Sequence, residues 1–152
     1  MAGWLVLNTD ASKPEASGDA AIGATLRQKP RSNAPMKVVA YISEVVGRVE
    51  VQEAEYLALI AGLNLALRQP PTMPPTYLQV FVDSATVAEQ VSGRAKVRGP
   101  VMKALHAEAR ELLGKIGEQR YRISWLPREL NREADQRASD AFLRRSTTAP
   151  RG

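Results

Sequence analysis

The chain has 152 residues, 44% of them apolar and 24% charged, a balance that suits one globular domain and argues against extended disorder. It has no cysteine and one histidine, which excludes a disulfide framework and a Cys/His zinc site. The formal net charge of +5 favours polyanionic partners, with nucleic acid first and an anionic membrane surface second.

The first residues of the sequence, MAGWLVLNTDAS, do not have the pattern of a secretory signal peptide. No basic residues precede its apolar run, and that run is too short for a secretory signal. No segment reaches the length needed to span a bilayer. We therefore expect a soluble, cytoplasmic protein with no membrane partner, and the lack of cysteine fits a reducing compartment.

The first half of the chain is predicted to form three strands and then a helix. Apolar runs bounded by turn residues predict strands over 4–10, 20–28 and 36–46. The stretch VQEAEYLALIAGLNLAL predicts a helix over 51–68, which ends at the proline-rich QPPTMPPT. Three consecutive strands suggest an antiparallel meander.

The second half alternates strands and helices. Strands are predicted over 77–83 and 121–126, and helices over 84–93, 99–117 and 131–145, the last with Asn131 as its N-cap. This alternation indicates an α/β fold in which the later strands add in parallel and helices cover the sheet. We expect one domain over 1–145 and a flexible tail over 146–152, and we expect Trp4 and Trp125 to pack in the core.

Two predicted strands end in an aspartate, Asp10 in LNTDAS and Asp83 in VFVDSA. If these strands lie side by side and parallel, both carboxylates reach the edge where open α/β sheets hold their functional sites. For either strand alone, an aspartate that begins a turn or caps a helix would be an adequate explanation.

Two further acids lie on predicted helices. Glu55 shares a helix face with Ala58 and Gly62, whose small size would let the helix pack closely on the sheet and point Glu55 at the rim. Asp135 stands four residues after Asn131, beside a face of small apolar residues.

Four carboxylates at one rim would repel each other, by about 4 kcal/mol for a pair 4 Å apart at an effective dielectric near 20. Such a cluster persists only if protons or cations neutralise it, and oxygen ligands favour Mg²⁺ or Mn²⁺. Asp10, Glu55, Asp83 and Asp135 therefore predict a two-metal site, of the kind that activates water and stabilises a departing oxygen in phosphoryl displacement.

Four motifs containing these acids, TDAS, AEYLALIAGL, VDSATVAEQVSG and PRELNREADQRAS, together resemble those of the type 1 ribonuclease H family over residues 4–142. The resemblance implies a mixed five-stranded sheet flanked by helices, in a single catalytic domain acting as a monomer. It implies an endonuclease that cuts the RNA strand of RNA–DNA hybrids, leaving 3′-hydroxyl and 5′-phosphate ends, with two Mg²⁺ or Mn²⁺ ions. Asp10 would bridge both ions, Glu55 and Asp83 would hold one, and Asp135 the other.

The resemblance also suggests substrate contacts, some of them altered. Ala11 stands where the family usually has glycine, Gln52 is the polar residue left before the Ala-Glu pair, and Arg128 occupies the loop that often carries a histidine. The full predicted substrate-binding set is Ala11, Ser12, Gln52, Ser84, Arg94, Lys96, Arg128 and Asn131.

The basic charge is concentrated in two acid-free segments, 27–37 and 94–103, which indicates contacts with a phosphate backbone. Three alternatives stay open at this stage: a nuclease of this fold that also or mainly cuts double-stranded RNA, a non-cleaving nucleic-acid-binding module, and a phosphatase with Asp10 as nucleophile. The four acids disfavour the second, and the lack of a second aspartate two residues after Asp10 disfavours the third.

Overall fold

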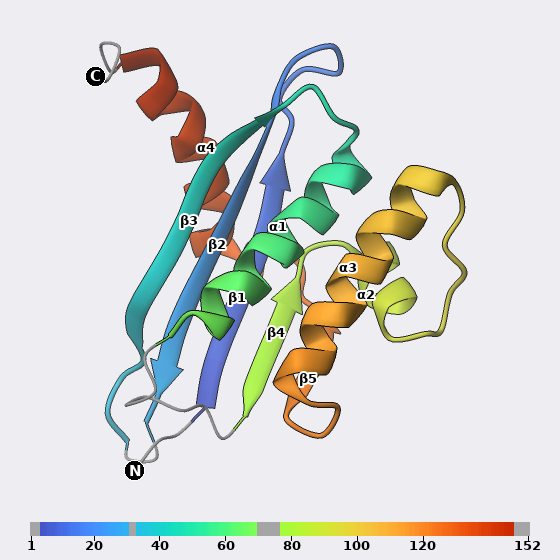
Figure 1. The fold of residues 1–152 in the computed structure, drawn as a ribbon. Helices are drawn as coiled ribbons and strands as arrows, with labels where there is room; N and C mark the ends of the chain where they lie inside the picture. Colours follow the sequence, from blue (N-terminus) through green and yellow to red (C-terminus); the bar gives the residue numbers. More distant parts are fainter. Residues whose placement is uncertain (1–3, 31–32, 70–76, 148–152) are drawn as a thin grey trace.

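The computed structural model describes residues 4–30, 33–69 and 77–147, without the side chains of residues 128 and 144–147 (Figure 1). Its elements are β1 (Trp4–Ser12), β2 (Ala20–Lys29), β3 (Lys37–Gly47), α1 (Val51–Leu67), β4 (Leu78–Val82), α2 (Ala85–Val91), α3 (Pro100–Ile116), β5 (Tyr121–Trp125), the short 3₁₀ helix η1 (Arg128–Leu130) and α4 (Arg132–Thr147). No helix in these ranges is both long and apolar enough to cross a membrane.

The strands form one mixed sheet in the order β3-β2-β1-β4-β5. The pairs β1–β2 and β2–β3 are antiparallel, and β1–β4 and β4–β5 are parallel. Helices α1 and α3 lie on one face of the sheet and α4 crosses the other (Figure 1). The predicted fold, with three antiparallel leading strands and two further parallel ones, is confirmed.

Helix α1 packs directly on β1 because its contact face is made of small residues. Ala58 is fully buried, and a Cβ added to Gly62 would lie 2.9 Å from Thr9 Cγ2 and 3.0 Å from the Leu7 Cδ atoms. The same face of β1 also buries Leu5, and both leucines belong to the main apolar core. Close approach of α1 to the central strand brings its first turns to the rim of the sheet.

Helix α4 approaches the opposite face in a similar way. Ala134 and Ala138 are fully buried, and a Cβ at Gly23 would collide with the Ala134 carbonyl oxygen and the Ala138 backbone nitrogen. Gly23 is the β2 residue paired with Asp10 in the antiparallel register. The missing side chain therefore lets α4 contact the sheet beside Asp10.

The structure differs from the sequence-based expectation at several ends. Strand β1 continues beyond Asp10 to Ser12, because its antiparallel pairing with β2 extends further than its parallel pairing with β4, which stops at Thr9 and Val82. Helix α4 runs to Thr147, so part of the predicted tail is helical, and residues 148–152 lie outside the described ranges.

The prediction that both tryptophans pack in the core is wrong. Trp4 is 43% exposed and Trp125 is 53% exposed. They are the first residue of β1 and the last residue of the edge strand β5, and strand periodicity does not show how far the covering helices extend. Trp4 makes an edge-on contact with Tyr77, with ring centroids 5.8 Å apart.

We predict that Gly23→Ala lowers the free energy of unfolding by about 1–3 kcal/mol, because the added methyl must push α4 away from β2. Gly114→Ala is the matched control: Gly114 lies within α3, where an added methyl group would meet open space, so alanine should stabilise by about 0.5–1 kcal/mol. Urea unfolding of both variants measures the difference, and equal effects would contradict the packing described for Gly23.

Candidate active site

Three carboxylates from separate elements meet at the rim of the sheet. Asp10 lies in β1, Glu55 in α1 and Asp83 directly after β4, and one oxygen from each lies within 4.8 Å of the others. Asp10 is fully buried, Glu55 is 8% exposed and Asp83 is half-buried. The cluster is therefore closed on the protein side and open to solvent beside Asp83.

The strand register explains how the two aspartates meet. Thr9 and Val82 are the last partners in the parallel β1–β4 ladder, so the next residue of each strand is an aspartate at the same edge. Glu55 reaches this edge from above because the face it shares with Ala58 and Gly62 packs on β1.

Asp135 completes the arrangement from the α4 side. It is not within the compact group of three, but its carboxyl lies within hydrogen-bonding reach of Asp10 and acts on the pKa of that residue. Asp135 lies on α4 next to Ala134, which contacts β2 at Gly23. The other three predicted carboxylates thus lie around Asp10.

The surroundings of Asp10 raise its pKa from 3.8 to about 9. Burial is the largest cause, hydrogen bonding to the Asp135 and Asp83 carboxyls follows, and the negative charges of Glu55 and Asp83 add to it. Both Oδ atoms of Asp10 are buried, and neither accepts a hydrogen bond from an N–H or hydroxyl donor in the described part of the chain. Converging carboxylate oxygens suit a hard divalent ion such as Mg²⁺ or Mn²⁺.

The predicted substrate-binding residues differ in their accessibility. Ser12 and Gln52 are partly exposed at the ends of β1 and α1 that border the cluster. Ser84 caps α2, since its Oγ accepts a hydrogen bond from the Val87 backbone nitrogen at 3.1 Å. The Arg128 side chain lies outside the described residues, although its backbone belongs to η1.

Burial does not support direct substrate contacts by the side chains of Ala11 and Asn131. Ala11 is 5% exposed, and its methyl group packs in the small apolar cluster with Ala54 and Ala58. Asn131 is 1% exposed, and its amide bonds to Asn8 and to the Thr9 carbonyl oxygen. In this structure Asn131 joins the start of α4 to β1.

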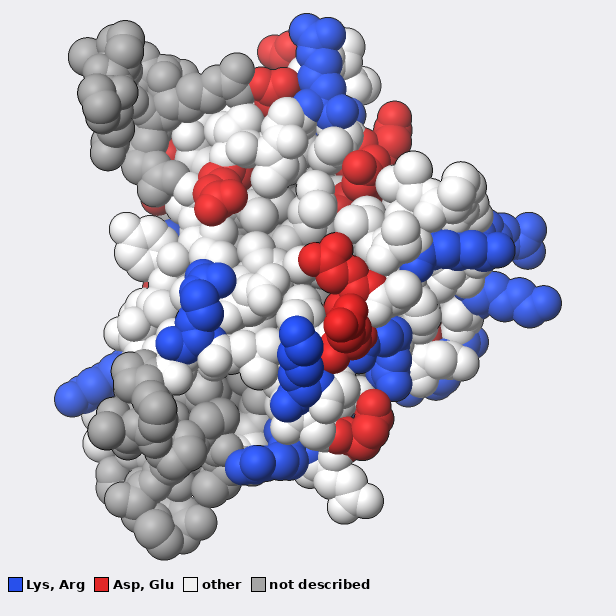
Figure 2. Space-filling model, in the orientation of Figure 1, with Lys and Arg blue, Asp and Glu red and all other residues white. Residues whose placement is uncertain are grey.

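Of the two basic segments, the one after α2 presents all four of its cations to solvent. Arg94, Lys96, Arg98 and Lys103 lie on and beside the α2–α3 connection, and all four are exposed. Figure 2 shows basic side chains projecting at the right of the molecule, where Figure 1 places this connection. In the segment 27–37, Lys29 and Lys37 are exposed, Arg31 lies outside the described residues, and Arg27 turns inward to Asn8.

Two residues that the sequence interpretation overlooked hold the exposed basic connection in place. Tyr56 Oη donates to Gln90 Oε1 at 2.7 Å, and Gln90 Nε2 donates to the Lys96 carbonyl oxygen at 3.1 Å. Burial raises the pKa of Tyr56 to about 12, so its hydroxyl stays protonated as a donor. The helix that carries Glu55 is thereby linked to the connection that carries Lys96.

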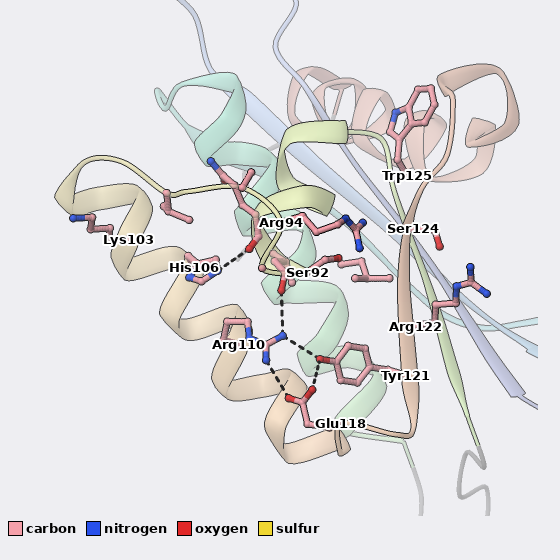
Figure 3. Close-up of a pocket in the computed structure, with 16 residues that line it drawn as sticks. Ser92, Arg94, Lys103, His106, Arg110, Glu118, Tyr121, Arg122, Ser124 and Trp125 are labelled. Atoms are coloured by element: carbon pink, nitrogen blue, oxygen red, sulfur yellow. Dashed lines mark hydrogen bonds and ion pairs between the residues drawn. The ribbon is translucent and has the colours of Figure 1, made fainter.

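An open pocket of about 950 Å³ lies between the α2–α3 connection, α3 and β5, and none of the four carboxylates lines it (Figure 3). Arg110 donates to the Val91 carbonyl oxygen and to Tyr121 Oη, both at 3.1 Å, and pairs with Glu118 at 3.1 Å. His106 bonds to the Gln90 carbonyl oxygen. These contacts join α3 to α2 and β5. The pocket is separate from the carboxylate site, because none of the four acids lines it.

We predict that Asp10 makes the metal-free protein less stable as the pH rises. The unfolded chain loses this proton near pH 4 and the folded chain keeps it to about pH 9, so the Asp10 contribution declines across that window. Asp10→Asn should therefore be more stable than the unsubstituted protein by about 1–3 kcal/mol at pH 8, with little difference at pH 4.

Thermal unfolding in a chelator at both pH values tests this prediction, and adding Mg²⁺ or Mn²⁺ at pH 8 should raise the Tm of the unsubstituted protein more than that of Asp10→Asn. Equal pH dependence of the two proteins would contradict the role given to the Asp10 carboxyl.

The comparisons with known proteins agree with this geometry. Residues 8–141 match the family described as reverse transcriptase-like. The bifunctional protein Rv2228c of Mycobacterium tuberculosis is 34% identical over 138 residues, 91% of this chain and 35% of the relative. A ribonuclease HI of Halobacterium salinarum is 32% identical over 105 residues, 69% of this chain and 50% of the relative. This chain therefore spans from about a third to half of the length of these two relatives.

Solved structures show the same fold. The N-terminal RNase H domain of Rv2228c superposes with a TM-score of 0.77 at 34% identity, covering 90% of this chain and 97% of that one. RNase H1 of H. salinarum superposes with a TM-score of 0.77 at 28% identity, covering 92% of this chain and 98% of that one. LC11-RNase H1, solved with an RNA/DNA hybrid, gives 0.80 at 22% identity, covering 94% and 99%, a likeness of fold. The chain belongs to the reverse transcriptase-like family and, within it, to the type 1 ribonuclease H family.

Proposed function

We propose that this chain hydrolyses the RNA strand of RNA–DNA hybrids with two Mg²⁺ or Mn²⁺ ions, leaving 3′-hydroxyl and 5′-phosphate ends. The observation that carries the proposal is the close cluster of Asp10, Glu55 and Asp83, with Asp135 against it and both Asp10 oxygens free of N–H or hydroxyl donors among the described residues. The relatives named ribonuclease HI and RNase H domain support the same reaction class.

In this proposal the four carboxylates divide the metal binding between them. Asp10, Glu55 and Asp83 would hold one ion, and Asp10 and Asp135 the other. When bound, the ions would supply the positive charge that stabilises the phosphoryl transition state and would lower the pKa of a water nucleophile. Asp10 is fixed by its strand, while the half-buried Asp83 and Asp135 face the solvent side from which a phosphate would arrive.

The surroundings suit a substrate recognised by shape. The exposed Arg94 and Lys96 would contact phosphates, and Gln52 and Ser12 at the rim would contact the 2′-hydroxyl side of the minor groove. Arg128, in the loop before α4, would assist the departing product. We further propose that the chain acts as a monomer in the cytoplasm.

We predict metal-dependent cutting of the RNA strand of a labelled hybrid, with no cutting of double-stranded DNA. Asp83→Asn should lower kcat by about 100-fold or more, because it removes one charged ligand from the site. Double-stranded RNA, tested in the same assay, measures the preference between this duplex and the hybrid. Binding of the hybrid without cutting, in both Mg²⁺ and Mn²⁺, would instead support a non-cleaving binding module.

We also predict that the paired substitution Arg94→Ala and Lys96→Ala raises KM for the hybrid and leaves kcat nearly unchanged, because these residues would bind phosphates away from the carboxylates. The plot of log affinity against log salt concentration should become less steep, by about 1 in slope for each lost phosphate contact. Lys115→Ala, which removes an exposed cation from the last turn of α3, is the control. If Lys115→Ala raises KM as much as the paired substitution does, the change would be a general effect of charge.

A further inference from the structure

The face of the sheet beneath α4 carries a continuous chain of polar side chains. Arg27 Nη2 donates to Asn8 Oδ1 at 2.9 Å, and Asn8 Nδ2 donates to Asn131 Oδ1 at 2.8 Å. Asn131 Nδ2 then donates to the Thr9 carbonyl oxygen at 2.9 Å. Asn8 is 3% exposed and Asn131 is 1% exposed, so the two bonds donated by their amides form away from water, while the bond from Arg27 is partly buried.

This chain of bonds reaches the backbone of the candidate site on both elements that it joins. The Thr9 carbonyl belongs to the peptide unit that joins Thr9 to Asp10. The carbonyl oxygen of Asn131 accepts a hydrogen bond from the Asp135 backbone nitrogen at 3.1 Å. Asn8 lies two residues before Asp10, and Asn131 lies four residues before Asp135, so each lies on the same side of its element as the acid that follows.

Such a chain is costly as a means of holding a helix on a sheet. Each buried polar group without a partner lowers the stability of the fold by about 1–3 kcal/mol, whereas apolar side chains of similar size would pack without this cost. Two further polar atoms on β2, Thr25 Oγ1 and Arg27 Nε, are buried without a hydrogen-bond partner among the described residues. What directed bonds provide beyond adhesion is a fixed distance and orientation between β1 and the start of α4.

We propose that Asn8, Arg27 and Asn131 are positioning residues that set the place of Asp135 relative to Asp10, and thereby the metal affinity of the site. The inference rests on the proposed function, because it takes these two acids as metal ligands. Arg27 orients the Asn8 amide, the Asn8 amide orients that of Asn131, and Asn131 ties α4 to the strand that carries Asp10. The half-buried Arg27 is thus assigned to this chain of bonds and not to the phosphate-binding surface.

The test compares Asn8→Ala and Arg27→Met with Arg27→Lys, which keeps a donor for Asn8. Arg110→Met is the matched control, because Arg110 also joins separate elements through several bonds but lies at the pocket beside β5. Mn²⁺ affinity is measured by electron paramagnetic resonance on substrate-free protein, at a temperature where urea titration shows every variant folded. Cutting of the hybrid then gives kcat and KM separately.

We expect Asn8→Ala and Arg27→Met to weaken Mn²⁺ binding by about 10-fold and to lower kcat with KM unchanged. Arg27→Lys should recover much of the affinity, and Arg110→Met should lose stability without losing affinity. Unchanged Mn²⁺ affinity in Asn8→Ala and Arg27→Met, or an equal loss in Arg110→Met, would overturn the proposal. If the unsubstituted protein binds Mn²⁺ but does not cut the hybrid, the proposed function fails while the affinities still decide the positioning role.

Discussion

The repulsion between carboxylates held around Asp10 is the constraint on which the rest of the structure depends. Asp10 is fully buried, and its two oxygens find no N–H or hydroxyl donor within the described residues. Without a cation, Asp10 keeps a proton: burial first, and then the neighbouring carboxyls and their repulsion, raise its pKa to about 9. Packing of α1 and α4 holds Glu55 and Asp135 in place against this repulsion.

The central strand β1 serves both helices through its two faces. One face, with Leu7 and Thr9, contacts α1 at Gly62, and the opposite face carries Asn8 and Asp10 toward α4. Each helix comes close because a glycine stands at the contact, Gly62 within α1 and Gly23 in β2 under α4. The same strand therefore provides the apolar core on one side and a polar, charged surface on the other, and the acids meet where the two sides reach the rim.

Much of the fold could be predicted from sequence, because apolar periodicity, proline breaks and strand order depend on local patterns. The acids could be proposed as a group because two end adjacent parallel strands and two lie on faces of small residues. What escaped prediction depends on contacts between distant residues. Arg27 looks like a surface cation until Asn8 is placed beside it, and Asn131 looks like a simple cap until its amide meets β1. The exposure of Trp125 follows from its position at the end of an edge strand, which periodicity does not show.

The most direct test of the central claim is the anomalous scattering of Mn²⁺ in crystals of the unsubstituted protein soaked with the ion. We expect an anomalous peak within coordination distance of Asp10, Glu55 and Asp83, with a second peak between Asp10 and Asp135 when substrate phosphate is present. Ions bound elsewhere, with Asp10 still protonated and unliganded, would contradict the claim. The cluster would then be a buried, proton-stabilised group of acids and not a metal site.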